Sequence, residues 1–305
     1  MKESTIGMTD GFQLNTCFAQ PVGTPVGHIH LLHGMSEHIA RYEEFANYLT
    51  GRGYIVTGHD HRGHGKTAKM NGLKGYFTDE FGFDRVVQDT YEIISTFRAQ
   101  YPSPKFILFG HSMGSFVARR YVQLYGSEID MAIFSGTGGD PGASRLAGLG
   151  VAYLQGKKNG FDQQNHFLNK LVFGGFNKSV DQPKTPFDWL SRDSEAVAKY
   201  IIDPECGVVP TTQFFIDLFK GLGEINDSDE INKIPKQLPV FLFSGNEDPV
   251  GDNGKGVLEV AKRYEKVGME DVTLMLFEGG RHEMLHETNR QNVFKAVGDW
   301  IEKNE

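Results

Sequence analysis

Residues 110–114 (GHSMG) place a serine between two glycines, directly after an apolar run and directly before a helix-like stretch. This Gly-x-Ser-x-Gly pattern, in that context, predicts a tight strand-to-helix turn that lifts the hydroxyl of Ser112 above a sheet. Glycine is expected at Gly110 and Gly114 because the strand and helix backbones nearly touch there. We therefore predict that Ser112 is the nucleophile of an acyl-transfer reaction. The alternative is a structural turn with a capping serine.

Two later residues complete this chemistry, because a serine hydroxyl needs a base and the base needs an acid to orient it. Asp248 follows one apolar run and His282 follows the next. Serine, acid and histidine thus occur in the chain order expected with this serine pattern, each at the end of a strand. Glu247 is the rival acid. His286 is the rival base, although we expect it to belong to the final helix.

An acyl-transfer site also needs two backbone N–H groups to stabilise the developing oxyanion. One is expected from Met113, the residue after the serine. The other is expected from the loop after the third strand, where Met35 follows His33 and Gly34.

Residues 57–67 (TGHDHRGHGKT) offer two other chemistries. The three histidines of this segment have the spacing of zinc ligands, and its last three residues end as a phosphate-binding loop does. The zinc hypothesis fails because Gly63 stands where the pattern needs an aspartate. The phosphate hypothesis fails because Asp60 stands where the loop needs its first glycine. We expect no metal and no cofactor.

The elements that must position these residues form an α/β pattern. Residues on either side of Thr9, Asp10 and Gly11 predict a hairpin of two strands. Short apolar runs that alternate with helix-like stretches predict a mostly parallel sheet flanked by helices, eight strands in all. The six later strands are expected at 28–34, 54–60, 105–111, 130–136, 239–245 and 272–280.

The alternation breaks between residues 138 and 238, where no strand of comparable strength occurs and apolar residues recur at helical spacing. We expect a helical cap inserted after the sixth strand. The predicted domains are therefore a core of residues 1–137 and 239–305 and a cap of residues 138–238.

The composition limits which binding partners and which cellular compartment are expected. Of 305 residues, 39% are hydrophobic and 23% are charged, a globular balance, and the net charge of −8 disfavours nucleic acid as a partner. Cys17 and Cys206 are too few for a disulfide framework and fit a reducing compartment. The polar N-terminus has no signal-peptide pattern and the apolar runs are short, so a cytoplasmic protein is expected.

These motifs together resemble those of α/β-hydrolases of the monoacylglycerol lipase and lysophospholipase group. That group's oxyanion loop reads H-G-x-G-E-H-x-x-R-Y, and residues 33–42 read HGMSEHIARY, with Ser36 in place of a glycine. Residues 60–67 match the group's D-x-R-G-H-G-x-[ST], which implies a structural loop beneath the active site with its charges bonded to backbone. The likeness covers residues 26–137 and 239–300, and the insertion matches the group's cap in position and helical character.

The resemblance implies a serine hydrolase that cleaves carboxylic esters of small single-acyl lipids, such as monoacylglycerols or lysophospholipids, through an acyl-enzyme. A carboxylesterase acting on short non-lipid esters, an aminopeptidase and a non-catalytic binding module are the alternatives. The cap would receive the acyl chain and could make transient contact with a membrane surface. The sequence leaves the oligomeric state open. Candidate substrate contacts are Glu37, Arg41, Phe167, Leu171 and Phe173.

Overall fold

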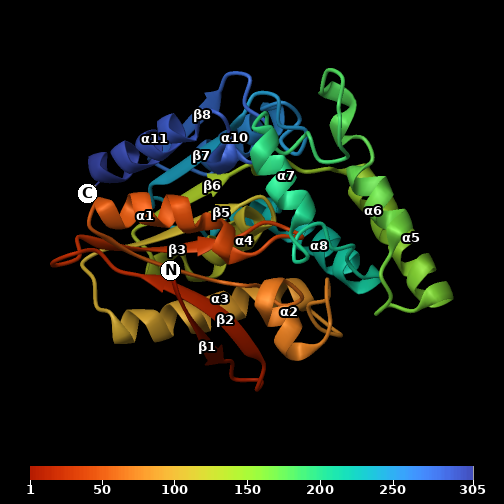
Figure 1. Cartoon of the computed structure of the whole chain (residues 1–305), viewed down its shortest axis with the longest axis horizontal. Helices are drawn as coiled ribbons and strands as arrows, with labels where there is room; N and C mark the ends of the chain where they lie inside the picture. Colours follow the sequence, from red (N-terminus) through yellow and green to blue (C-terminus); the bar gives the residue numbers. More distant parts are fainter. Residues whose placement is uncertain (305) are drawn as a thin grey trace.

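The apolar runs form a central sheet in the computed structural model, which describes residues 1–304 (Figure 1). Within those residues the sheet has eight strands in the order β1-β2-β4-β3-β5-β6-β7-β8. β1 (Lys2–Gly7) and β2 (Gln13–Ala19) form the predicted antiparallel hairpin, and β2 is antiparallel to β4. The other neighbouring pairs are parallel. The predicted fold class is confirmed.

The later strands lie where the apolar runs predicted them, with bounds that differ by up to three residues; β3 begins one residue earlier than predicted. Where a strand is shorter than its apolar run, the remaining residues belong to the adjoining loops. The bounds are β3 (Gly27–Leu32), β4 (Tyr54–His59), β5 (Phe106–His111), β6 (Met131–Ser135), β7 (Val240–Gly245) and β8 (Val272–Phe277).

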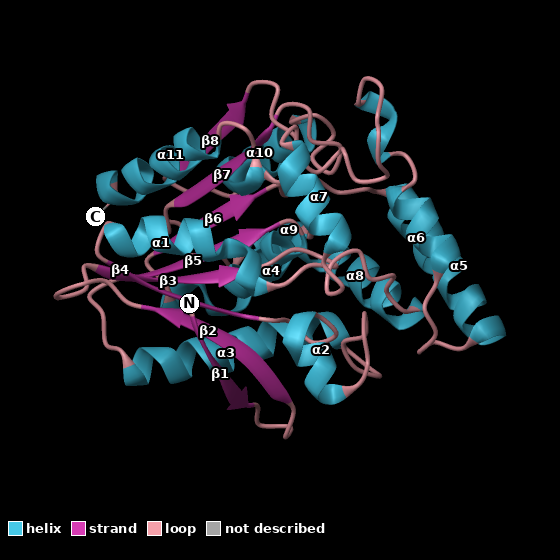
Figure 2. Cartoon of the chain, viewed as in Figure 1, coloured by secondary structure: helices cyan, strands magenta, loops and turns pink. Residues whose placement is uncertain are grey.

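Helices cover both faces of the sheet, which explains why the strand sequences are apolar on both sides (Figure 2). On β5, Ile107 and Phe109 pack in the core shared with α1 (Glu43–Gly51) and α11 (Arg290–Lys303). Phe106 and Leu108 pack on the opposite face. The helices of that second face are α3 (Gly82–Gln100), α4 (Met113–Tyr125) and α10 (Lys255–Lys266). This is the two-residue alternation of a strand buried on both faces.

The segment between β6 and β7 is helical, as predicted. Its helices are α5 (Ala143–Asn159), α6 (His166–Phe173), α7 (Ser194–Ile202), α8 (Thr212–Ile225) and α9 (Ser228–Asn232). α5 and α6 lie at the side of the molecule farthest from α11 (Figure 1). α8 instead places Phe214 and Phe215 in the same core as Val117 and Tyr121 of α4. The insertion thus shares its apolar core with the sheet, and its description as a separate cap domain stays a prediction.

Short helices occur in the connections between the longer elements. They are α2 (Gly65–Asn71) and the 3₁₀ turns η1 (Ile39–Tyr42), η2 (Gly126–Glu128), η3 (Phe176–Ser179, within the insertion) and η4 (Met284–His286). The expectation that His286 belongs to the final helix is wrong, because it ends η4 and α11 begins only at Arg290.

Within residues 1–304 no helix combines the length and the apolar character that crossing a membrane requires.

Candidate active site

Ser112 occupies the sharp turn between β5 and α4 with φ 52° and ψ −120°. This left-handed region is strained for a residue with a side chain. The turn is as crowded as expected: a Cβ on Gly110 would lie 2.3 Å from the carbonyl oxygen of Gly114, and one on Gly114 would lie 2.3 Å from that of Leu32. Only glycine fits at these two positions without moving backbone.

A chain of three hydrogen-bonded side chains begins at this serine. Its Oγ lies 2.8 Å from Nε2 of His282, and Nδ1 of His282 lies 2.9 Å from Oδ1 of Asp248. Two further groups hold the carboxylate: the Ser244 hydroxyl donates to Oδ2 at 2.6 Å, and the Val250 amide donates to Oδ1 at 2.9 Å. These two hydrogen bonds hold the Asp248 carboxylate in a fixed orientation against the His282 imidazole. Sequence reasoning missed Ser244, which lies inside a strand.

The three residues come from the carboxyl ends of β5, β7 and β8, and β6 lies between the first two. The rival residues are placed elsewhere. Glu247 is exposed, whereas Asp248 is fully buried. The ring of His286 packs edge-on to Tyr42 with its centroid 6.1 Å away.

The electrostatics of the pair favour a charged acid beside a basic imidazole. Burial on its own would raise the pKa of Asp248, but His282 and the hydrogen bonds to the carboxylate bring it below its usual value. Burial on its own would lower the pKa of His282, but the Asp248 carboxylate and its hydrogen bond raise it above the usual value. His282 is therefore a stronger base than a free histidine.

The oxyanion loop, residues 33–38, lies against the serine. A Cβ on Gly34 would lie 3.2 Å from Cβ of Ser112, and Met35 and Met113 both line the cavity that contains the serine. Ser36 has φ 56°, a conformation in which glycine is usual, so the loop keeps that backbone geometry with a serine. The Ser36 hydroxyl donates to the Val208 carbonyl at 2.6 Å. The role of the two methionine amides stays a prediction.

Glu37 and Arg41 are paired within the protein. The Arg41 guanidinium donates to Glu37 at 2.5 Å and to both carboxylate oxygens of Glu283 at 2.6 and 2.7 Å. Glu37 also accepts from the Gly34 amide at 2.5 Å and from the Tyr42 hydroxyl at 2.8 Å. Burial would raise the pKa of Glu283, yet Arg41 holds it at about 2. This network fixes the oxyanion loop, and a substrate contact by Glu37 or Arg41 stays a prediction.

A cavity of about 1000 Å³ opens above the serine. Its walls include the side chains of Phe116, Val151, Leu171, Phe173, Leu218 and Leu222. Phe167, predicted to face the same space, is 56% exposed and does not line it. The spacing of α6 explains this, because Leu168 takes the buried face of the helix and turns Phe167 outward. Trp189, which sequence reasoning missed, packs its ring 5.1 Å from that of His282.

The family described as serine aminopeptidase, S33 matches residues 23–289. This chain belongs to that family. It is similar to the monoglyceride lipase of Mus musculus, at 27% identity over 301 residues that cover 96% of this chain and 88% of the relative. The monoacylglycerol lipase of Mycolicibacterium smegmatis is 27% identical over 284 residues, which cover 92% and 90% of the two chains.

Solved structures show the same architecture. A thermostable carboxyl esterase from Bacillus coagulans, in complex with glycerol, superposes with a TM-score of 0.91 at 28% identity and covers 99% of this chain and 98% of its own. A monoacylglycerol lipase from Paleococcus ferrophilus, at 23% identity and a TM-score of 0.72, shares the fold over 96% of this chain and 99% of its own. The protein is therefore an enzyme of the α/β-hydrolase superfamily, and the resemblance predicted from its motifs is confirmed.

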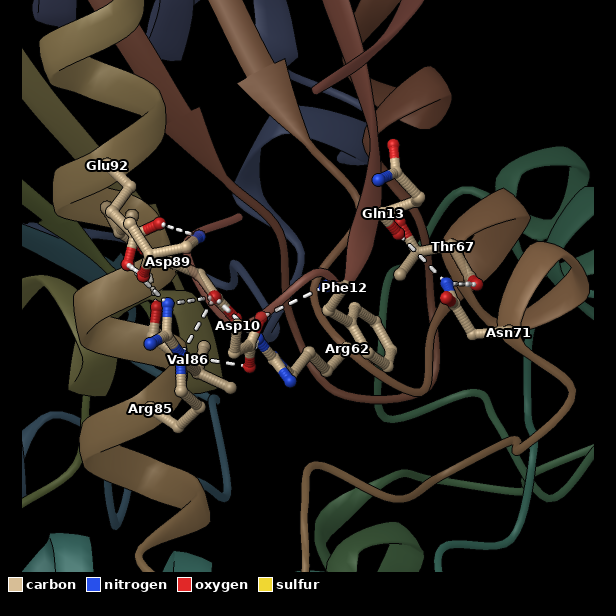
Figure 3. A network of polar contacts seen from close by, with 12 residues as sticks. Asp10, Phe12, Gln13, Arg62, Thr67, Asn71, Arg85, Val86, Asp89 and Glu92 are labelled. Carbon is tan, nitrogen blue, oxygen red and sulfur yellow. Dashed lines mark hydrogen bonds and ion pairs between the residues drawn. The ribbon is translucent and has the colours of Figure 1, made fainter. Parts of the chain in front are cut away.

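In this α/β-hydrolase, only some of the charged side chains of residues 60–67 are bonded to backbone. Asp60 accepts from the amides of Ile39 and Lys66 at 2.8 and 2.9 Å, as expected. The expectation is wrong for Arg62, which donates to Asp89 of α3 at 2.5 and 2.9 Å and to Asp10 of the hairpin at 2.6 Å (Figure 3). A buried guanidinium needs carboxylate partners, and both partners are distant in sequence.

The three histidines of residues 57–67 are buried, and burial disfavours their charged forms. Burial lowers the pKa of His59 to about 3 and that of His64 to about 4. His59 shares a hydrogen bond of 3.0 Å with His30, and its ring lies edge-on to that of His61. Within residues 1–304, the groups of three side chains close enough to share a metal ion do not include these histidines.

Proposed function

We propose that this α/β-hydrolase cleaves carboxylic esters of small single-acyl lipids through an acyl-enzyme intermediate. The observation that carries the proposal is the hydrogen-bonded chain from Ser112 through His282 to Asp248, which opens into a large apolar cavity. Relatives along almost the whole chain are monoglyceride lipases, which supports the substrate class.

In the proposed reaction, Oγ of Ser112 attacks the ester carbonyl carbon while Nε2 of His282 accepts the hydroxyl proton. Asp248 holds the imidazole in the required tautomer and stabilises its positive charge. The amides of Met35 and Met113 donate to the oxyanion. The C–O bond to the alcohol then breaks and His282 protonates the leaving oxygen. Water repeats the sequence on the acyl-enzyme, releases the fatty acid and restores the serine.

The cavity favours an acyl chain over a charged substrate. Its lining is largely apolar, and each buried methylene contributes about 0.8 kcal/mol of binding. An aminopeptidase would need a free carboxylate to bind the substrate ammonium group. The carboxylates of Glu37 and Glu283 line this cavity, but both are ion-paired with Arg41, so neither is free to bind an ammonium group. The site therefore favours an ester with a neutral alcohol.

The test is kcat/KM for p-nitrophenyl esters with acyl chains from acetyl to palmitoyl, together with a monoacylglycerol and a lysophosphatidylcholine. We expect kcat/KM to rise several-fold for each two-carbon step until the cavity is full. A preference for acetyl esters would favour the carboxylesterase alternative, which the likeness to the Bacillus coagulans carboxyl esterase supports. Faster cleavage of aminoacyl amides would contradict the ester proposal and leave the serine mechanism intact.

A further inference from the structure

Residues 203–208, between α7 and α8, cross over the oxyanion loop, and we call this segment the strap. Backbone and hydroxyl groups already join the two. The Gly207 amide and the Tyr200 hydroxyl both donate to the carbonyl of Ser36, at 2.9 and 3.0 Å. The Ser36 hydroxyl donates to the carbonyl of Val208. A ligand bound by both segments would therefore strengthen a contact that these hydrogen bonds already form.

Three side chains of metal-binding type meet at this junction. His38 extends from the oxyanion loop, and Asp203 and Cys206 extend from the strap. One ligand atom from each lies within 4.8 Å of the other two, and Nε2 of His38 is 2.9 Å from Oδ2 of Asp203. Around a tetrahedral zinc ion, ligand atoms lie about 3.3 to 3.6 Å apart, as follows from Zn–N and Zn–O bonds of about 2.0 Å and Zn–S bonds of about 2.3 Å. Small side-chain movements are enough to reach that geometry.

The strap presents its two ligands from one turn. The Cys206 amide donates to the Asp203 carbonyl at 3.1 Å, and the Glu205 amide donates to Oδ1 of Asp203 at 2.8 Å. This leaves the other carboxylate oxygen facing His38. The side chains of His38 and Asp203 are 12% and 30% exposed, so an ion can enter from solvent and keep a water ligand.

A second group with ligand spacing, Glu37, His111 and Glu283, offers a useful contrast. The guanidinium of Arg41 lies between its two carboxylates and forms an ion pair with each. Both carboxylates therefore already have a cationic partner. The same pairing cancels the charge with which Arg41 would otherwise repel an ion at Cys206.

We propose that His38, Asp203 and Cys206 bind a divalent ion of the zinc class, with water as the fourth ligand, and that the ion fastens the strap to the oxyanion loop. Nitrogen, oxygen and sulfur together favour zinc or cobalt over magnesium or calcium, which prefer oxygen alone. A thiol binds metal as a thiolate, so metal binding must release the Cys206 proton to solvent and must tighten as pH rises. This site is separate from the proposed ester hydrolysis.

The probe is Co²⁺ added to the 305-residue protein after EDTA treatment and buffer exchange, without any ester present. We expect one equivalent to give the visible bands of tetrahedral cobalt and a near-ultraviolet thiolate-to-cobalt band, and Zn²⁺ to displace both. Cys206→Ser should abolish the thiolate band. His38→Ala and Asp203→Asn should each weaken binding at least 10-fold. Cys17→Ala, which removes the other cysteine of the chain, is the matched control and should keep the spectrum. Circular dichroism checks that each variant is folded.

Hydrogen exchange tests the fastening itself. Zn²⁺ should slow exchange of the amides in residues 203–208 and 36–38 of the parent protein and should not do so in Cys206→Ser. A parent protein without a thiolate band, or a band that survives in Cys206→Ser, would overturn the site. Binding without slower exchange would overturn the link between strap and loop. None of these readouts depends on turnover, so the proposed function stands or fails independently.

Discussion

Ser112 combines a strained backbone with a hydroxyl aimed at an imidazole, and a strained position of this kind costs about 1 to 3 kcal/mol. The surrounding contacts leave the turn little freedom to relax, since Gly110 and Gly114 press against neighbouring backbone. The residue is thus held in the orientation that a nucleophile needs, at the expense of local stability.

Replacing the hydroxyl should remove the chemistry and leave the fold. We expect Ser112→Ala to lower kcat for p-nitrophenyl butyrate by about 10⁵-fold or more, because the remaining oxyanion donors give only residual catalysis. The Tm of the variant should differ from that of the parent protein by no more than a few degrees. Mass spectrometry after a fluorophosphonate should find a single adduct, on the peptide that contains Ser112; an adduct on another peptide would refute the assignment.

The pH profile should report on the pair of His282 and Asp248. Only neutral His282 accepts the serine proton, so kcat/KM should fall as pH drops through its pKa, and the carboxylate places that midpoint above about 6.5. Asp248→Asn should move the midpoint to lower pH and reduce kcat by about 10⁴-fold. Glu247→Gln is the control and should leave both values unchanged; the reverse pattern would make Glu247 the acid.

At the scale of elements, α8 joins the insertion to the core and carries a buried acid, Asp217. Burial raises the pKa of its carboxyl to about 7, against smaller opposing effects of Gln213, the Gly82 backbone and Lys220. The Gln213 amide donates to Oδ1 at 3.0 Å. Between about pH 4 and pH 7 the folded protein therefore keeps a proton that the unfolded chain has already released.

This difference has a definite sign. Because the folded state binds the extra proton, the free energy of unfolding should fall as pH rises from about 4 to 7. Asp217→Asn removes this ionisation. The variant's free energy of unfolding, relative to that of the parent protein, should therefore be higher at pH 8 than at pH 5 by roughly 1 to 3 kcal/mol. Urea unfolding of parent and variant at both pH values measures this. The exposed Asp229→Asn is the control, and an equal shift in that variant would show that the effect is not specific to the buried site.

The sequence predicted those elements that are encoded in a short stretch of neighbouring residues. It did not predict contacts between segments that are distant in the chain. The strands at 105–111 and 239–245 and the order of Ser112, Asp248 and His282 follow from short apolar runs and from residues directly after them. No such run indicates that Arg62 pairs with Asp89 or that Ser36 binds Val208, because those contacts depend on how whole elements are arranged. Phe167 was misplaced for a similar reason: helical spacing defines a face but not its neighbour.

At the scale of the whole molecule, the proposed reaction draws on side chains and backbone amides of one chain. The hydrogen-bonded groups supply a nucleophile, a base and an orienting acid, so the mechanism assigns no step to a metal. We expect EDTA followed by buffer exchange to leave kcat/KM for p-nitrophenyl butyrate within a factor of two. Elemental analysis of the treated protein is the check. Activity that is lost with the metal and returns with zinc would require a catalytic ion.

The insertion leaves the sheet after Ser135 and returns at Val240, and β6 and β7 are neighbours. Because these neighbouring strands are parallel, the chain departs at the carboxyl edge of the sheet and re-enters at the opposite edge, while the carboxyl ends of β5, β7 and β8 keep the reacting groups together. For protein engineering this makes the segment exchangeable: a graft must start at the carboxyl end of β6 and cross to the amino end of the neighbouring β7. It must also bring its own equivalent of Phe214 and Phe215, because these side chains complete the core beneath the graft. Substrate range could in this way be redesigned without moving the catalytic groups.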